Sequence, residues 1–321
     1  KFKEAMEYAL QAKQLGTAKI GADNYNSIIT LIQDLMSYKN YTYTLDFTLF
    51  PKNSYKRDGH IFICEPSTNL PYQEVLSLTI SGAKLSYKKI EFGNNVIYIK
   101  SNGDIPFNIQ VVVKKNVFSY QNLFNKYNRS DSYPQEALKY LGNAKKITPE
   151  SPTIKNISKK LKGKSDLATI KNIINWMTEN LRYQILPIFK NVDEVIKRGF
   201  GECVGLSATA VALCRASGIP ARQVWGFVDA GTDFSRPGYL KGHAWVEVYI
   251  KGIGWMPFEQ RSIFNFGLLP ISYIRIGHSF DAISNLYEEN NYFMPTANFS
   301  RAVYVENLGG DVVKYKRTEI R

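Results

Sequence analysis

Cysteine and histidine are scarce in this chain, which has three of each among 321 residues. The cysteines, Cys64, Cys203 and Cys214, lack the paired CxxC spacing of zinc sites, and their positions do not suggest a disulfide framework. If Cys203 and Cys214 lie on one helix, they are about 16 Å apart, which is beyond disulfide reach. We therefore predict neither a structural metal nor a cofactor, and we interpret Cys214 as a buried apolar residue.

Long apolar runs are also missing. No stretch approaches the roughly 18 to 20 apolar residues needed to cross a bilayer, and no signal-peptide pattern opens the chain. We therefore expect a protein that is not transmembrane. Because the chain begins at Lys1 without an initiator Met, we expect a mature or trimmed product that is secreted or associated with the cell envelope.

Acidic residues are fewer than basic ones. The chain has 28 Asp and Glu against 41 Lys and Arg, a net charge of +13. This balance favours an anionic partner such as a cell-wall or surface polymer, and a basic surface tuned only for solubility explains it equally well. Recognised nucleic-acid-binding motifs are absent, so we predict no specific nucleic-acid partner.

The hydrophobic pattern divides the first half of the chain in two. Residues 1–38 have apolar side chains at helix spacing and are predicted to form a helical segment. From Tyr41 the period changes to two, which predicts an antiparallel β-sandwich over residues 39–118. The expected strands are Tyr41–Leu49, Ile61–Cys64, Val75–Ile80, Lys84–Phe92, Val96–Lys100 and Phe107–Lys114.

The second half predicts mixed structure, so the fold class is α+β. Residues 119–165 are expected to be a connector with short helical pieces, and residues 166–321 a second domain. This domain begins with a helix over 167–181, capped by Ser165 or Asp166, and a second helix follows Cys203. Strands are expected at 224–228, 243–250 and 255–258, followed by a long irregular segment and a C-terminal hairpin around Gly309-Gly310-Asp311.

Cys203 lies between Gly201 and Gly205 at a predicted helix start. Unpaired backbone N–H groups in the first turn of a helix favour a thiolate there. His243 and Glu259 follow along the chain, so the sequence supplies the thiol, imidazole and carboxylate of a nucleophilic thiol enzyme. The Cys203 N–H is a candidate oxyanion donor. The candidates for a second donor are Trp176, Tyr183 and Gln184, which otherwise serve core packing.

The hairpin that carries His243 and Glu259 has to satisfy one geometric condition. A four-residue loop over 251–254, with Ile250 opposite Trp255, would point Glu259 to the other face of the sheet from His243. A loop of three or five residues, or a bulge, puts both side chains on one face. Gly252 and Gly254 supply the conformational freedom that such a loop needs.

Four linked motifs resemble the transglutaminase-like superfamily. They are Gly201-Glu202-Cys203, Ala216-Ser217-Gly218-Ile219-Pro220-Ala221-Arg222, His243-Ala244-Trp245-Val246-Glu247-Val248 and Gly254-Trp255-Met256-Pro257-Phe258. Residues 172–183 and 273–277 resemble the flanking stretches of its bacterial members, and the resemblance covers residues 134–281. It implies a papain-like α+β core, here behind an N-terminal β-rich domain. In that core Cys203 is the nucleophile, His243 the base and acid, and Glu259 the third residue, where the family usually has Asp.

The resemblance implies acyl-enzyme chemistry on peptide or carboxamide bonds. We favour a cysteine peptidase or amidase acting on a peptide or protein amide, because the sequence shows no calcium-loop pattern of clustered acids. One alternative is a cross-linking transglutaminase that passes the acyl group to an amine. The other is an inactive scaffold or cell-surface binding protein, in which the Glu-for-Asp change at Glu259 marks lost activity.

Several side chains have a second interpretation that needs no catalysis. Glu259 could form an ordinary salt bridge with Arg261 or Arg275. His60 and His278 lack motif partners and are interpreted as surface or core histidines. Trp245 and Trp255 are expected to pack the sheet and to shield the triad. Residues 1–38 are also a candidate segment for occluding the cleft.

Overall fold

The computed structural model describes most of the two predicted domains. The described residues are 32, 40–49, 61–91, 93–100, 107–128, 131–144, 146–184, 191–228, 239–278 and 312–320. The predicted helical segment 1–38 lies outside them except for Ile32, which is helical and buried. The predicted hairpin turn Gly309-Gly310-Asp311 and His60 lie outside them as well.

All six strands predicted between Tyr41 and Lys114 are present. They are β1 (Asn40–Leu49), β2 (Ile61–Cys64), β3 (Gln73–Ser81), β4 (Lys84–Glu91), β5 (Asn94–Lys100) and β6 (Phe107–Lys115). In β6, buried side chains alternate with more exposed ones along the whole strand. This is the pattern expected when one face of a strand is covered and the other is not.

The connector contains the short helical pieces that the sequence predicts. They are η2 (Tyr120–Lys126), α3 (Gln135–Leu138), η3 (Lys139–Leu141) and α4 (Pro152–Leu161). The longer helix α5 (Asp166–Asn180) begins where predicted, because the Ser165 side chain accepts a hydrogen bond from the Ala168 N–H. This N-cap satisfies one of the first-turn donors that a helix cannot pair internally.

The rest of the second half contains the predicted helix after Cys203 and the three predicted strands. Its elements are β7 (Arg182–Tyr183), α6 (Val192–Arg198), β8 (Phe200–Gly201), α7 (Cys203–Ala216), β9 (Ala221–Val228), β10 (Tyr239–Ile250), β11 (Gly254–Phe258), η5 (Ile263–Asn265), β12 (Ile274–His278) and β13 (Val312–Ile320). Five of these elements, β7, α6, β8, η5 and β12, were not predicted. The strand β12 falls inside the segment that the sequence predicts to be irregular, and that part of the prediction is wrong.

Most strands belong to one antiparallel sheet of eight strands. Its order is β12-β9-β10-β13-β1-β6-β3, and β11 pairs with β10. The strand β13 pairs with β10 on one side and with β1 on the other, so it joins strands from both halves of the chain. A second sheet has the order β2-β5-β4. The predicted α+β class with antiparallel sheets is therefore confirmed.

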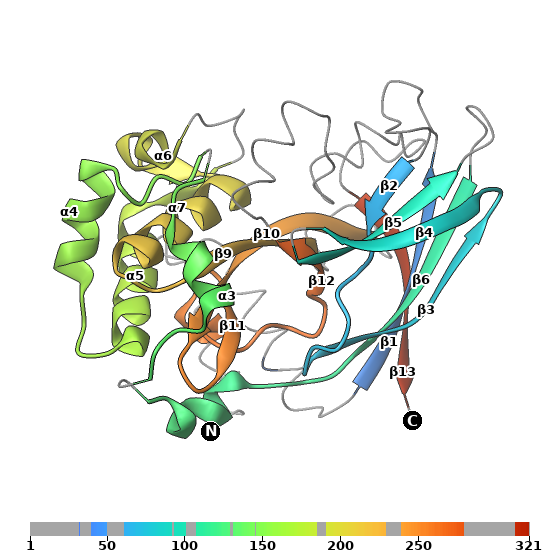
Figure 1. Ribbon diagram of the computed structural model, residues 1–321, viewed down its shortest axis with the longest axis horizontal. Coiled ribbons are helices and arrows are strands. Elements are labelled where there is room, and N and C mark those ends of the chain that lie inside the picture. The colour runs from blue at the N-terminus through green and yellow to red at the C-terminus, as the bar shows by residue number, and fades with distance from the viewer. Residues whose placement is uncertain are drawn as a thin grey trace, which may run out of the picture.

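The helices and the N-terminal strands occupy opposite ends of the molecule. In Figure 1, α4, α5, α6 and α7 gather at one end, whereas β1 to β6 lie at the other, and β9 and β10 run between them. The division of the chain at residues 118 and 165 stays a prediction, but strands from both sides of it share one sheet.

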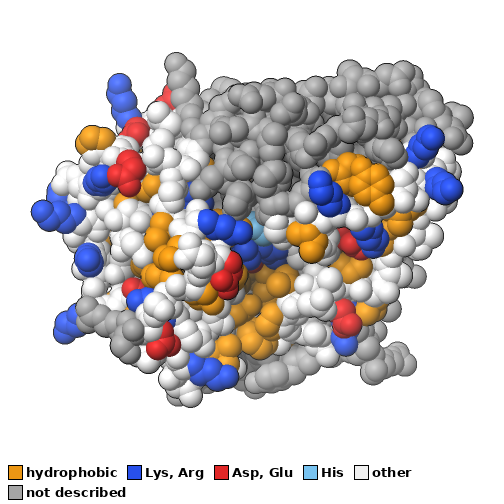
Figure 2. Space-filling view, in the orientation of Figure 1, with side chains coloured by type: hydrophobic (Ala, Val, Ile, Leu, Met, Phe, Trp, Pro, Cys, Tyr) orange, Lys and Arg blue, Asp and Glu red, His pale blue; other side chains and the backbone are white. Residues whose placement is uncertain are grey.

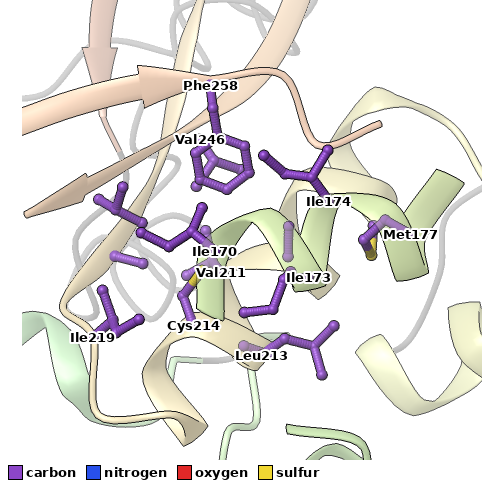
Figure 3. Packing of buried hydrophobic residues seen from close by; sticks show 14 of the residues in the cluster. Ile170, Ile173, Ile174, Met177, Val211, Leu213, Cys214, Ile219, Val246 and Phe258 are labelled. Atoms are coloured by element: carbon purple, nitrogen blue, oxygen red, sulfur yellow. The ribbon is translucent and has the colours of Figure 1, made fainter. Parts of the chain in front are cut away.

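The main core lies between the helices and the sheet. Ile170, Ile173 and Met177 of α5 are fully buried with Leu213 and Cys214 of α7 (Figure 3). Burial of each large apolar side chain contributes about 1.5–3 kcal/mol. Burial also raises the pKa of the Cys214 thiol. The interpretation of Cys214 as a buried apolar residue is therefore confirmed.

A second core lies between the two sheets. Ile97 and Ile99 of β5 pack with Leu45 of β1, Val113 of β6 and Ile274 of β12, all of them buried. This is the face-to-face packing that a β-sandwich requires. Since β12 comes from the second half of the chain, this core also joins the two halves.

Basic side chains are spread over the surface. On the face in Figure 2, Lys and Arg side chains lie singly or in small groups around the described part of the molecule. Among the described residues, no helix is both long enough and apolar enough to cross a membrane.

Candidate active site

Cys203 is the first residue of α7, as its predicted place at a helix start requires. The preceding residue, Glu202, is the N-cap, and its carboxylate accepts hydrogen bonds from the Val204 N–H at 2.7 Å and the Gly205 N–H at 3.0 Å. Cys203 is partly exposed, in contrast to the buried Cys214 near the other end of the helix. The helix thus presents the Cys203 thiol near the surface on a rigid support.

The β10–β11 hairpin has the shorter of the two predicted loops. Ile250 pairs with Gly254, so residues 251–253 form a three-residue loop. The backbone φ angles of Gly252 and Gly254 are 76° and 97°, in the left-handed region that favours glycine. Continuing this register places Glu259 opposite Trp245, so its side chain points to the same face as Trp245 and His243.

His243 lies between the other two predicted site residues. Its Nε2 atom is 2.6 Å from Oε1 of Glu259, and its side chain also hydrogen-bonds Cys203. Burial alone would lower the pKa of His243, but the charge of Glu259 and the hydrogen bonds with Cys203 and Glu259 raise it from 6.5 to about 10. The structure therefore brings Cys203, His243 and Glu259 together.

Tyr273 completes the surroundings of the carboxylate. Its hydroxyl hydrogen-bonds Glu259, and its ring meets the His243 ring edge-on at 5.8 Å between centroids. Burial and the charge of Glu259 raise the pKa of Tyr273, so the hydroxyl remains a donor. Sequence reasoning assigned no role to Tyr273. The available signal was its place at the start of the 273–277 motif.

Trp245 forms the wall behind His243, as predicted. The two rings are 6.1 Å apart and nearly parallel, and Trp245 is fully buried. It fits because Gly226 lies beneath it, where a Cβ atom would be 2.6 Å from the Trp245 ring and 2.0 Å from the Ile274 carbonyl oxygen. Any larger residue at Gly226 would displace the wall or the neighbouring strand.

Trp255 has a different role from the one predicted. It stacks on the Arg222 guanidinium at 3.9 Å and meets the rings of Tyr140 and Tyr249 edge-on. Trp255 pairs with Tyr249 in the hairpin, six residues along β10 from His243, or about 20 Å at the rise of a strand. Its predicted part in sheet packing is confirmed, and its predicted part in shielding the triad is wrong.

Arg275, one of the two proposed salt-bridge partners of Glu259, pairs with a different carboxylate. Arg275 pairs with the buried Glu247, with Nε 2.8 Å from Oε1, and Arg222 pairs with the same side chain at 2.7 Å. Burial by itself raises the pKa of Glu247, but the two guanidinium groups lower it to about 2. The Arg275 guanidinium therefore forms its salt bridge with Glu247 and not with Glu259.

Arg261, the other proposed partner of Glu259, also has a different environment. Its buried Nε atom has no hydrogen-bond partner among the described residues, and burial lowers the pKa of its guanidinium. Its carbonyl oxygen accepts a hydrogen bond from Thr178 of α5 at 3.0 Å. This bond ties the turn after Glu259 to the helix.

His278 is a core histidine, as one of its two interpretations expected. It is 4% exposed, its Nε2 is 2.9 Å from the Tyr140 hydroxyl, and its Nδ1 is 3.0 Å from Nη2 of Arg275. Nε2 also lies 3.4 Å from Nη1 of Arg222, so both ring nitrogens face a guanidinium, which can only donate. Burial and the charges of Arg222 and Arg275 hold the pKa of His278 well below 6.5, so the ring is neutral.

The three candidates for a second oxyanion donor differ in their surroundings. Trp176 is partly buried against the main core. Tyr183 pairs with Gly201 through the short β7–β8 ladder, and the Gln184 N–H donates to the Gly201 carbonyl at 3.0 Å. Tyr183 and Gln184 are exposed beside the segment that leads to Cys203. The role of a second donor stays a prediction.

Metal ligands do not gather in this part of the chain. Within the described segments, no group of three or more His, Cys, Asp and Glu side chains is placed to hold a metal ion. The site is therefore best described as a thiol, an imidazole, a carboxylate and their aromatic surroundings.

Comparisons with known proteins show what this part of the chain resembles. The sequence profile of the transglutaminase-like superfamily matches residues 155–260. An uncharacterized protein of Haemophilus influenzae is 26% identical over 145 residues, which are 37% of this chain and 39% of that protein. The uncharacterized protein YebA of Bacillus subtilis is 31% identical over 103 residues, which are 27% of this chain and 13% of that protein. This chain thus spans well under two thirds of either relative.

A solved structure extends the comparison to the fold. A candidate cysteine protease of Cytophaga hutchinsonii superposes with a TM-score of 0.56 at 15% identity, covering 88% of this chain and 91% of that chain. At this level of identity the likeness shows a shared fold. The profile match includes Cys203, His243 and Glu259. Residues 155–260 therefore match the transglutaminase-like superfamily in sequence, and the chain shares its fold with the Cytophaga protein.

Proposed function

We propose that the protein is a cysteine peptidase or amidase in which Cys203, His243 and Glu259 act as a catalytic triad. The observation that carries the proposal is the position of His243, which hydrogen-bonds Cys203 and lies 2.6 Å from Glu259. A base held between a nucleophile and an orienting carboxylate is the arrangement that nucleophilic catalysis requires. The family of residues 155–260 supports the same chemistry.

The first half of the reaction forms a thioester. With the thiol proton already held on His243, the Cys203 sulfur attacks the carbonyl carbon of a peptide or carboxamide bond. His243 then donates this proton to the nitrogen of the tetrahedral intermediate. The carbon–nitrogen bond breaks, an amine or ammonia leaves, and the acyl group stays on Cys203.

The second half restores the starting enzyme. Water attacks the thioester carbon, and His243 accepts a proton from it. The carbon–sulfur bond then breaks, a carboxylic acid leaves, and the Cys203 sulfur is left beside the protonated His243. In both halves Glu259 stabilises the imidazolium, and the Tyr273 hydroxyl holds Glu259 in place.

The tetrahedral oxyanion requires hydrogen-bond donors. Glu202 takes the N–H groups of Val204 and Gly205, and the Leu206 N–H bonds to the Glu202 carbonyl at 2.9 Å. The Cys203 N–H is the remaining donor of this first turn. We therefore assign it as one oxyanion donor.

The proposal is tested by the pH dependence of alkylation at each cysteine, read by site-resolved mass spectrometry. In the parent protein, we expect fast alkylation of Cys203 that persists to acid pH and is lost in His243→Ala. Cys64, which is partly exposed on β2 and far along the chain from the site, serves as the reference thiol in the same sample. If Cys203 follows the profile of Cys64 in both proteins, the triad is wrong and the scaffold alternative is favoured.

Hydrolysis and amine transfer share the thioester and differ in what resolves it. Incubating the protein with a glutamine-containing peptide, with and without a primary amine, separates them by product mass. We expect the acid or deamidated peptide in both samples. An amine adduct as the main product would make the protein a cross-linking transglutaminase.

We also propose an extracytoplasmic setting with an anionic polymer nearby. The net charge of +13 supports this, since it attracts polyanions such as those of a cell wall. Pull-down on isolated cell wall at rising salt tests it. We expect binding that weakens as salt rises, and binding that does not depend on salt would contradict an electrostatic anchor.

A further inference from the structure

Glu202 places a carboxylate directly against the thiol. Its Oε2 atom lies 3.5 Å from the Cys203 sulfur, which donates to it, and also accepts the Val204 N–H at 2.7 Å. Its Oε1 atom accepts the Gly205 N–H at 3.0 Å. The sulfur therefore has two partners, His243 and Glu202.

This arrangement changes the electrostatics of the helix end. The first-turn N–H groups of a helix favour a nearby negative charge, which is the usual reason for a reactive thiolate at such a position. Here the Glu202 carboxylate occupies two of these donors. A second negative charge on the Cys203 sulfur would form 3.5 Å from the first, and like charges at that distance repel.

We propose that Glu202 is a positioning residue whose charge disfavours a thiolate at Cys203 unless the protonated His243 lies beside the sulfur. Its hydrogen bonds fix the first turn of α7, and its charge opposes the loss of the thiol proton. Activation of the nucleophile then depends on the His243–Glu259 pair and not on the helix end. This inference rests on the proposed function, because it concerns how that nucleophile is activated.

The test compares the alkylation profile of Cys203 in the parent and in Glu202→Gln. Glutamine keeps the size of the side chain and one oxygen acceptor, and it removes the charge. Two unit charges 3.5 Å apart in water correspond to about one pH unit, so we expect the midpoint of the Cys203 profile to fall by about that much. Glu74→Gln, which removes an exposed carboxylate on β3, is the matched control and is expected to leave the profile unchanged.

A structural role alone would give a different result. If Glu202 is only a helix cap, Glu202→Gln lowers the Tm and leaves the midpoint where it was, and this outcome would overturn the proposal. Should Glu202→Gln fail to fold, Glu202→Asn supplies a favourable neutral cap and the same comparison. The midpoint of the Cys203 alkylation profile can be measured in Glu202→Gln and in His243→Ala independently. An unchanged midpoint in Glu202→Gln would overturn only this inference, and an unchanged profile in His243→Ala would overturn the proposed triad.

Discussion

At the scale of single residues, Glu259 stands where the family usually has Asp. Its extra methylene extends the carboxylate far enough to contact two side chains. The Glu259 carboxylate reaches His243 at 2.6 Å and also bonds the Tyr273 hydroxyl. Shortening it in Glu259→Asp withdraws the carboxylate from both partners. We expect kcat/KM on a peptide amide to fall by about tenfold, roughly the loss of one modest hydrogen bond.

The same position offers a stricter variant. Glu259→Gln keeps the length and removes the charge that stabilises the imidazolium, so a larger loss of about 10³–10⁴ is expected. Glu74→Asp, on the far strand β3, is the matched control for a shortened carboxylate and should leave kcat/KM unchanged. Activity of Glu259→Asp at or above that of the parent would mean that Glu259 does not orient His243.

Lys115 carries a second prediction at this scale, because it is 1% exposed and has no carboxylate partner among the residues that the structure describes. Its Nζ atom is 3.2 Å from Oε1 of Gln73 and lies over the Tyr72 ring at 4.5 Å. Burial holds the pKa of Lys115 well below 10.5. The Gln73 oxygen keeps a second donor, the Arg275 N–H, at 2.8 Å. We therefore expect Lys115→Met to raise the free energy of unfolding at pH 7 by about 1 kcal/mol or more.

The sign of the pH dependence checks this interpretation of Lys115. A buried amine with a lowered pKa binds fewer protons in the folded state, so the parent protein gains stability as the pH rises towards 10.4. The advantage of Lys115→Met in urea unfolding should therefore shrink between pH 7 and pH 9.5. Lys114→Met, at the half-buried neighbour on β6, is the control and should change little. An advantage that is constant with pH would mean that the lost charge is not the cause.

At the scale of elements, the β10–β11 hairpin depends on Gly252. Its φ is +76°, and a Cβ atom there would lie 2.2 Å from the Lys126 carbonyl oxygen of η2. Gly254 has a similar φ of +97° but open space around it. Gly252→Ala and Gly254→Ala therefore share the backbone cost of about 1–2 kcal/mol, and only the first adds a clash.

Thermal unfolding of both variants measures the difference. We expect a lower Tm and a lower kcat/KM for Gly252→Ala, because displacing the hairpin from η2 also moves Glu259 away from His243. Gly254→Ala should lose stability with less effect on kcat/KM. Equal losses in both variants would show that contact with η2 does not position the hairpin.

Local rules in the sequence were enough to predict the elements of this site. The Ser165 cap, the period of two from Tyr41 and the loop condition on His243 and Glu259 all depend on residues close in sequence, and each is present in the structure. The strand β12 was missed for a physical reason. It is buried on both faces yet contains Arg275 and His278, whose burial depends on the distant Glu247 and Tyr140. A strand of this kind lacks the alternation that sequence reasoning can detect.

At the scale of the whole molecule, what the sequence did not reveal is how its two halves join. The pairing of β13 with both β1 and β10 connects residues far apart in the chain, and no local pattern specifies it. Hydrogen bonds from buried polar side chains also connect the two halves. Gln73 of β3 bonds the Arg275 carbonyl at 2.6 Å, and Asn94 of β5 bonds the His278 carbonyl at 2.9 Å.

This junction makes the protein sensitive to acid. His278 faces the charges of Arg222, Arg275 and Lys139, which with burial hold its pKa well below 6.5. His278 therefore binds a proton in the unfolded chain but not in the folded chain. The free energy of unfolding falls as the pH drops below about 6.5. The low pKa of Glu247, about 2, adds stability that is present above about pH 4.5 and lost below it.

The two contributions can be separated because they occupy different pH ranges. In His278→Gln, whose amide can still hydrogen-bond Tyr140, we expect the free energy of unfolding to depend less on pH between 6.5 and 5, by up to about 1.4 kcal/mol per pH unit. The loss below pH 4.5 should remain, because Glu247 is unchanged. Urea unfolding across this range measures both. An unaltered slope above pH 5 would mean that His278 is protonated in the folded protein, and the two buried guanidinium groups would then have to tolerate a third positive charge beside them.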